Sequence, residues 1–167
     1  MKSSEIFNWA EYEAILYPVL HEAIIRVSKK YPNIQFYGMC IDCNAEYGQV
    51  LLHLNTESDI IENKKEEYWD VGDWEYFDLM DELQNNDNFF NKAWKRYEDY
   101  IVENMFQDDE ENPIEDFMVM ISKVANKLQN SEAIKTLNKT QNFRIVAADH
   151  DEDIEDGYER MEKLKNA

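Results

Sequence analysis

The sequence predicts one α+β domain over residues 1–167, built from a small antiparallel sheet with helices packed on it. Long segments with apolar residues at three- and four-residue spacing indicate amphipathic helices, and shorter runs rich in β-formers lie between them. No internal repeat, low-complexity linker or change in composition marks a domain boundary. The chain is 44% hydrophobic and long enough to enclose a core without a metal or a disulfide.

The first helix is predicted over residues 4–30, where apolar residues such as Tyr12, Leu16 and Leu20 recur with helical spacing. Pro18 lies inside this pattern and has no backbone N–H to donate. We therefore expect either a kink or the first turn of a second helix at that position.

A β-hairpin is predicted next, because two runs rich in β-formers, residues 34–42 and 49–55, flank the turn-prone residues 44–48. Side chains alternate between the two faces of a strand. In the second strand one face is therefore apolar and the other carries a histidine, with Val50, Leu52 and Leu54 on the first and Leu51 and His53 on the second.

Two helices, a strand and a final charged helix complete the predicted order. Apolar spacing places the two helices at residues 90–105 and 114–128, and Pro113 suits the first position of the second helix. Residues 143–148 have the composition of a buried strand, and residues 151–165 form the final helix. Runs of strands and helices in this mixed order are typical of an α+β fold.

Charge is distributed unevenly along the chain. The net charge is −19, and three segments hold most of the acids: residues 57–87 with twelve, 108–116 with six and 149–160 with seven. A surface of this kind repels nucleic acid and anionic membranes and steers basic proteins toward it. We therefore expect a basic protein partner, with no direct nucleic acid and no membrane among the partners.

The sequence also predicts the cellular compartment of the protein. No apolar run approaches the roughly 18 residues that cross a bilayer, and the first residues do not form the apolar core of a targeting segment. Two cysteines, with no disulfide framework, suit a reducing environment. These features predict a cytoplasmic protein, and its oligomeric state is left open.

Two sets of side chains are candidates for chemistry, and neither has the spacing that a known site requires. Cys40 and Cys43 form C-x-x-C without a following helix or a second ligand pair, so we expect one to lie in the core and the other in a turn. The histidines His21, His53 and His150 belong to three different elements and carry no metal-binding motif. The sequence therefore predicts no metal and no catalytic residue.

The acidic run at residues 149–153 begins like a calcium-binding loop. Ile154 occupies the position that needs glycine for the turn, and Arg160 stands where the bidentate glutamate is required. We interpret these acids as capping and charging the first turn of the final helix. With only four glycines the chain also has no phosphate-binding loop, so no cofactor is expected.

One segment, residues 68–78, interleaves large aromatics with acids. Aromatic anchors beside carboxylates suit binding to Arg and Lys on a partner. The alternative is that the tryptophans face the core while the acids face water, and both interpretations can hold together. The predicted partner-binding residues are Trp69, Asp70, Asp73, Trp74, Glu75 and Asp78.

A family resemblance rests on the long first helix and on short motifs along the chain: residues 36–42, 54–57, Tyr68-Trp69 with Trp74 five residues later, and residues 143–149 followed by Glu159-Arg160. On these the chain resembles an uncharacterised bacterial family, domain of unknown function 4303, over nearly its whole length. The resemblance implies an α+β domain, sometimes met in the company of toxin immunity proteins such as those of the SUKH group. It implies no functional residues.

Charge and resemblance together favour an acidic binding protein, immunity- or antitoxin-like, that inhibits a basic effector such as a nuclease toxin. Two alternatives remain open. A carboxylate-based hydrolase or metal-dependent enzyme would need acids that converge only after folding. A plain protein-interaction subunit would use its acids mainly for solubility.

Overall fold

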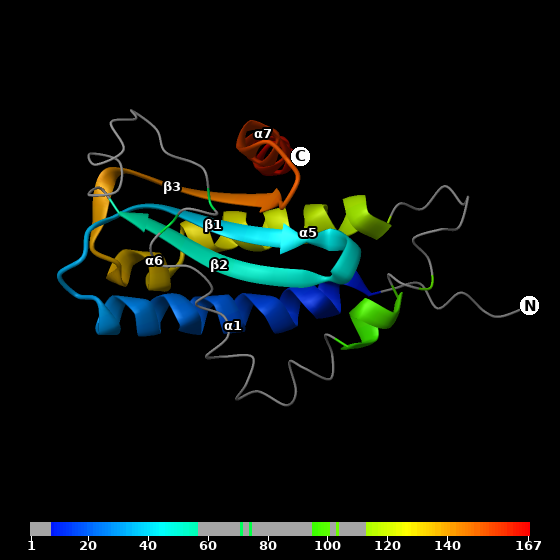
Figure 1. Ribbon diagram of the computed structural model, residues 1–167, viewed down its shortest axis with the longest axis horizontal. Coiled ribbons are helices and arrows are strands. Elements are labelled where there is room, and N and C mark those ends of the chain that lie inside the picture. The colour runs from blue at the N-terminus through cyan, green and yellow to red at the C-terminus, as the bar shows by residue number, and fades with distance from the viewer. Residues whose placement is uncertain (1–7, 57–70, 72–73, 75–94, 101–102, 104–112) are drawn as a thin grey trace, which may run out of the picture.

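In the computed structural model the described residues are 8–56, 71, 74, 95–100, 103 and 113–167. Helices and strands follow one another in the order helix, hairpin, helices, strand, helix (Figure 1). Residues 95–100 are also helical. The elements are α1 (Trp9–Lys30), β1 (Phe36–Asn44), the 3-10 turn η1 (Ala45–Tyr47), β2 (Gln49–Thr56), α5 (Pro113–Gln129), α6 (Glu132–Thr136), β3 (Lys139–Asp149) and α7 (Ile154–Lys165).

Three strands of the described chain form one sheet in the order β2-β1-β3. The hairpin strands β1 and β2 pair antiparallel, as expected, and η1 with Gly48 in the left-handed conformation closes the turn between them. β3 pairs with β1 in parallel, because the chain returns through helices before it enters the sheet again. The α+β class is confirmed, and the sheet is mixed instead of wholly antiparallel.

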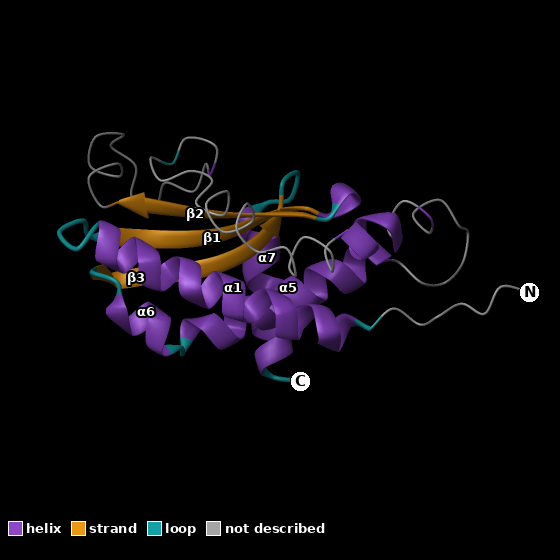
Figure 2. Cartoon of the chain, turned by 90° about the horizontal axis from the view of Figure 1, so that it is seen from below, coloured by secondary structure: helices purple, strands orange, loops and turns teal. Residues whose placement is uncertain are grey.

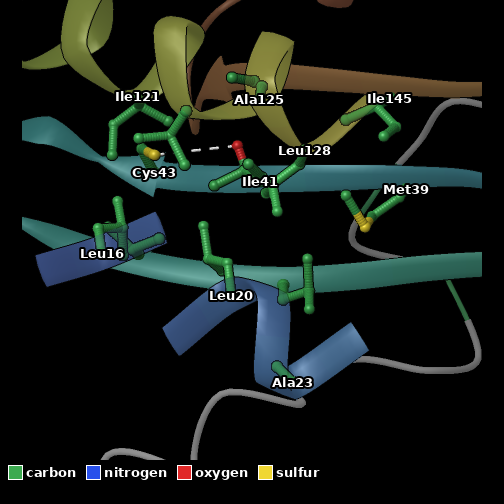
Figure 3. Packing of buried hydrophobic residues seen from close by; sticks show 14 of the residues in the cluster. Leu16, Leu20, Ala23, Met39, Ile41, Cys43, Ile121, Ala125, Leu128 and Ile145 are labelled. Atoms are coloured by element: carbon green, nitrogen blue, oxygen red, sulfur yellow. Dashed lines mark hydrogen bonds between the residues drawn. The ribbon is translucent and has the colours of Figure 1, made fainter. Parts of the chain in front are cut away.

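Helices cover one face of the sheet, which we call the helix face. α1 and α5 lie side by side beneath the strands (Figures 1 and 2). In β1 every second side chain, Met39, Ile41 and Cys43, points toward them, as strand alternation requires. Figure 3 shows this contact, with Leu16, Leu20 and Ala23 of α1 in the lower half of the picture and Ile121, Ala125 and Leu128 of α5 in the upper half.

α1 is one continuous helix that includes Pro18. Asn8 precedes it, and its side chain accepts a hydrogen bond from the N–H of Glu11 at 3.3 Å, which satisfies one of the unpaired donors of the first turn. The predicted apolar stripe is confirmed, since Leu16 and Leu20 are fully buried. Residues 4–7 of the predicted helix lie outside the described residues.

Several other helices and strands begin at residues different from those predicted, where the sequence pattern is local and weak. β3 begins four residues earlier than predicted, and the short helix α6 was not predicted at all. Ser131 starts α6 by accepting a hydrogen bond from the N–H of Ile134. α7 begins at Ile154, three residues late, because the preceding acids form a hydrogen-bonded turn.

The opposite face of the sheet, which we call the second face, has its own apolar cluster. Cys40, Val146, Ala148 and Trp74 are buried there together.

α7 crosses β3 closely at Gly157, where an added Cβ would lie 2.6 Å from the carbonyl oxygen of Ala147. Glycine is therefore required at this crossing. None of the helices in the described ranges has the length and apolar character to cross a membrane.

Candidate functional site

The parallel strands β1 and β3 bring polar residues together where both strands end. Asp42 pairs in register with Ala148, and Cys43 with Asp149, so the carboxyl ends of the two strands meet at one edge. His150 follows directly, and its N–H donates to the carbonyl oxygen of Cys43 at 2.6 Å. Carboxyl ends of parallel strands are where α/β folds commonly place ligand-binding groups.

Asp42 lies on the second face between two imidazoles. Its Oδ2 is 3.5 Å from Nε2 of His53 and 3.6 Å from Nδ1 of His150. His53 comes from β2, where it sits diagonally across from Asp42 on the same face. The His53 side chain is 0% exposed, that of Asp42 is 11% exposed and that of His150 is 67% exposed. The three residues therefore run from the interior to the surface.

The electrostatic state of Asp42 follows from this position. Burial raises the pKa of its carboxyl above the usual value, and the charge of Asp149 acts in the same direction. Both imidazoles oppose that shift, because their cationic forms favour the carboxylate. Such a group can exchange a proton with a neighbour at a small cost in free energy, which is the property needed in acid–base chemistry.

A second polar network fixes the turn between β3 and α7. The Arg160 guanidinium binds both carboxylate oxygens of Glu152, at 2.5 and 2.6 Å, and Glu152 also accepts from the N–H of Asp149 at 3.0 Å. Asp149 in turn accepts from the N–H of Ala45 at 2.9 Å, which links this turn to η1. Two of the acids that begin like a calcium loop, Asp149 and Glu152, are therefore used in hydrogen bonds of the fold. Asp153 occupies the N-cap position of α7 without a side-chain cap hydrogen bond, so the predicted capping by its side chain is wrong.

Exposed carboxylates surround this edge of the sheet. We call them the acidic end. They come from η1, from the first turn of α5 and from the turn and first residues of α7, which lie toward the end of the sheet where β1 and β3 stop (Figure 1). Its members are Glu46, Glu115, Asp116, Asp151, Asp153, Glu155 and Asp156. Two of the three acidic segments of the sequence thus contribute to one end of the molecule.

Both cysteines lie in β1, and both are buried. The expectation that one of them lies in a turn is wrong, because the strand extends to Asn44. Cys40 faces the second face and Cys43 faces the helix face. Burial raises the pKa of each thiol well above its usual value, so both stay protonated and unreactive at neutral pH.

Of the predicted partner-binding residues, the structure describes only Trp74. Its ring is 3% exposed and packs in the second-face cluster against Cys40, Val146 and Ala148. Trp74 therefore faces the core, which is the alternative interpretation given above for the tryptophans of this segment. It is not part of the exposed surface. Trp69, Asp70, Asp73, Glu75 and Asp78 lie outside the described residues, and their role stays a prediction.

Histidines are partly gathered by folding. His53 and His150 meet at Asp42, whereas the ring of His21 lies tilted against that of Tyr17 on α1. No group of three His, Cys, Asp or Glu side chains in the described ranges is arranged to hold a metal ion. The sequence contained one usable signal for this site. Asp42 stands at the end of one predicted strand, and Asp149-His150 directly follows another. Using it required the parallel pairing of those strands, which is a long-range contact.

Fold and site together define a small α+β domain with one helix-covered face and a polar, mostly acidic edge. A match to a protein-family model gives a more specific classification than the fold. The chain belongs to the family described as Domain of unknown function (DUF4303), whose model matches residues 17–166, from α1 to α7. No curated protein and no solved structure matches the chain at a significant level.

Proposed function

We propose that this protein binds a basic protein through its acidic end, as an immunity- or antitoxin-like inhibitor of an effector such as a nuclease toxin. The observation that carries the proposal is the polarity of the molecule. Exposed acids gather where β1 and β3 end, and exposed lysines gather at the other end of the sheet. Clustered charge of one sign speeds the encounter with an oppositely charged partner.

The basic end is built by elements that lie far along the sheet from the acidic end. α1 ends in Lys29 and Lys30, and α6 docks beside that end through the hydrogen bond of Thr136 to Ser28 at 3.0 Å. Lys135 and Lys139 add to the same region. Among the described residues the two ends of the sheet therefore differ in charge, and this difference would orient a basic partner toward the acidic end.

Charge at the acidic end is only partly neutralised from within. The single cation of the segment 149–160, Arg160, is turned inward and binds Glu152, Ala147 and Ser122. Lys95 and Arg96, which lie nearby on the helical residues 95–100, are each within ion-pair distance of an acid. The carboxylates of Glu155 and Asp156 therefore remain exposed at the first turn of α7.

Inhibition by such a surface would follow from charge alone. A nuclease presents cationic side chains to the phosphates of its substrate. An acidic surface that covers them excludes the substrate, and the same charge repels nucleic acid from this protein. An effector that acts inside the cell must be met there, so a cytoplasmic location is part of the proposal.

Co-purification with the product of the neighbouring gene tests the proposal. We expect a basic partner whose association rate falls as salt rises, because screening weakens steering. The double variant Glu155→Gln/Asp156→Asn should lower the association rate roughly two- to tenfold. The matched control Glu22→Gln/Glu132→Gln removes the same charge from α1 and α6 and should leave the rate near wild type. Equal effects of both variants would rule out the acidic end as the interface.

A second candidate function, a hydrolase, is favoured by the contact of Asp42 with His150. A carboxylate beside Nδ1 orients an imidazole whose other nitrogen can take a proton from water. Any hydrolysis of ester or phosphoester substrates by the purified protein should then be lost in Asp42→Asn and in His150→Gln, and kept in His21→Gln. Activity that survives both changes would exclude these residues as the base. A plain interaction subunit would bind its partner without inhibiting any reaction.

A further inference from the structure

His53 is enclosed within the second face of the sheet and has an acceptor at each ring nitrogen. Nε2 lies 3.5 Å from Oδ2 of Asp42, and Nδ1 lies 3.4 Å from the carbonyl oxygen of Val71. The two contacts connect β2 to β1 on one side and to the chain at Val71 on the other. A carbonyl oxygen can only accept a hydrogen bond, and so can a carboxylate.

Neutral imidazole carries a single N–H. While Asp42 is a carboxylate, either neutral tautomer of His53 turns one lone pair toward an acceptor. The imidazolium form donates from both nitrogens and satisfies both contacts. We propose that His53 is held as an imidazolium in the folded protein at neutral pH, so that a buried ion pair with Asp42 forms a proton-dependent tie between β1, β2 and Val71.

The shared proton belongs on the histidine for two reasons. Imidazole is the stronger base of the two groups by about two pKa units in water. Burial narrows that gap by raising the pKa of Asp42, but the nearby imidazoles favour its carboxylate form. With Val71 already requiring a proton on Nδ1, the second proton settles on Nε2, which faces Asp42.

Other titratable groups near the pair come from both neighbouring strands and from the turn before α7. They act mainly on Asp42 and on the thiol beside it. His150 and Asp149 influence the carboxyl of Asp42 in opposite directions, and Asp42 and Glu152 both oppose ionisation of Cys40, the register partner of His53. Among the described residues these are Asp42, Cys40, Asp149, His150 and Glu152. Arg160 binds Glu152 and the buried thiol stays protonated, so the negative charge that favours a cation at His53 is the carboxylate of Asp42.

The sign of the pH dependence follows. The folded chain keeps on His53 a proton that an unfolded chain releases near the ordinary histidine pKa of about 6.5. The stability contributed by the pair is therefore full below that pH and is lost as pH rises until the folded protein also releases the proton. Over that interval the unfolding equilibrium constant should rise by up to about tenfold per pH unit.

Side-chain ¹⁵N NMR of the uniformly labelled full-length chain tests this directly at pH 7.5, where a free histidine is about nine-tenths neutral. We expect both ring nitrogens of His53 to show the protonated pattern of an imidazolium. Single replacement of His21 and of His150 assigns their resonances, and the third ring is then that of His53. A His53 ring with one bare nitrogen at this pH would overturn the proposal, and this result needs no His53 variant to fold.

Denaturation from pH 6 to 9 provides a second readout with matched variants. His53→Gln, which has no titrating group, should remove the alkaline rise in the unfolding constant. His150→Gln removes the other imidazole at Asp42 but leaves the Val71 contact, and it should retain the rise. The proposal fails if the wild-type rise persists unchanged in His53→Gln.

Discussion

Arg160 and Glu152 join the middle of α7 to the turn that precedes it through two parallel hydrogen bonds, Nη1 to Oε1 at 2.5 Å and Nη2 to Oε2 at 2.6 Å. The same guanidinium donates to the carbonyl oxygen of Ala147 at 3.2 Å and to the hydroxyl of Ser122 at 3.0 Å. One side chain therefore connects β3, α5 and α7. This gives Arg160, which is part of the family resemblance, a structural role.

Replacing Arg160 by Gln should cost about 2–4 kcal/mol of unfolding free energy, because Glu152 then keeps its charge in a largely buried place without its cationic partner. Urea denaturation at pH 7 measures the loss. Lys163→Gln is the control, since its pair with Glu159 is exposed and is worth about 0–1 kcal/mol. Similar losses in the two variants would contradict a special role for Arg160.

Gly157→Ala tests the close crossing of α7 over β3. In an open helix this change stabilises by about 1 kcal/mol. Here the new Cβ would lie 2.6 Å from the oxygen of Ala147 and 3.1 Å from Cγ2 of Val146, so α7 must shift. We expect a net destabilisation of about 1–3 kcal/mol.

The exposed change Glu155→Ala on the same helix serves as the reference, and its effect should stay within about 0.5 kcal/mol. Thermal or urea unfolding of the two variants compares them. A stabilising Gly157→Ala would mean that α7 does not approach β3 this closely.

Local sequence patterns predicted the elements that build the helix face. The spacing of Phe117, Ile121 and Leu128 placed α5, because burial on one side of a helix imposes a period on the sequence. Alternation also assigned the two faces of β2, although most residues on both faces of that strand are buried. The direction of β3 could not be read in this way. It depends on how the chain crosses back over the sheet, and strand composition does not record that path.

The contact of Asp42 with His53 and His150 escaped prediction for the same reason. The contact joins residues of β1 and β2 to His150, which directly follows β3. β3 lies beside β1 only because it enters the sheet in parallel after a long crossover. The acidic end was easier, since the charge of the segment 149–160 is visible in the sequence. The inward direction of Arg160 could not be predicted, because a single arginine among acids gives no sign in the sequence of which way its side chain points.

Trp74 should matter for stability before it matters for binding. Its ring is buried against Cys40 and Val146, so Trp74→Ala should cost about 3–5 kcal/mol. Trp74→Phe keeps part of the ring volume and should lose less. Chemical denaturation followed by circular dichroism measures both changes.

Tyr47, whose side chain is 67% exposed at the hairpin turn, provides the contrast. Tyr47→Ala should change stability by about 0.5 kcal/mol or less. A small effect for Trp74→Ala would return this tryptophan to the candidates for an exposed partner-binding residue.

Cys40 and Cys43 should remain two separate thiols under oxidising conditions. They lie three positions apart on one strand, so their side chains point to opposite faces and their Cα atoms are about 10 Å apart, beyond the roughly 7 Å that a disulfide spans. Burial also raises the pKa of both thiols, so little thiolate is available for exchange. Mass spectrometry after treatment with a mild oxidant should show no loss of two hydrogen atoms, the mass change that a disulfide would cause. Alkylation should be slow at pH 8 for the folded chain and complete in denaturant, and rapid labelling of Cys43 in the native protein would contradict its place between the sheet and the helices α1 and α5.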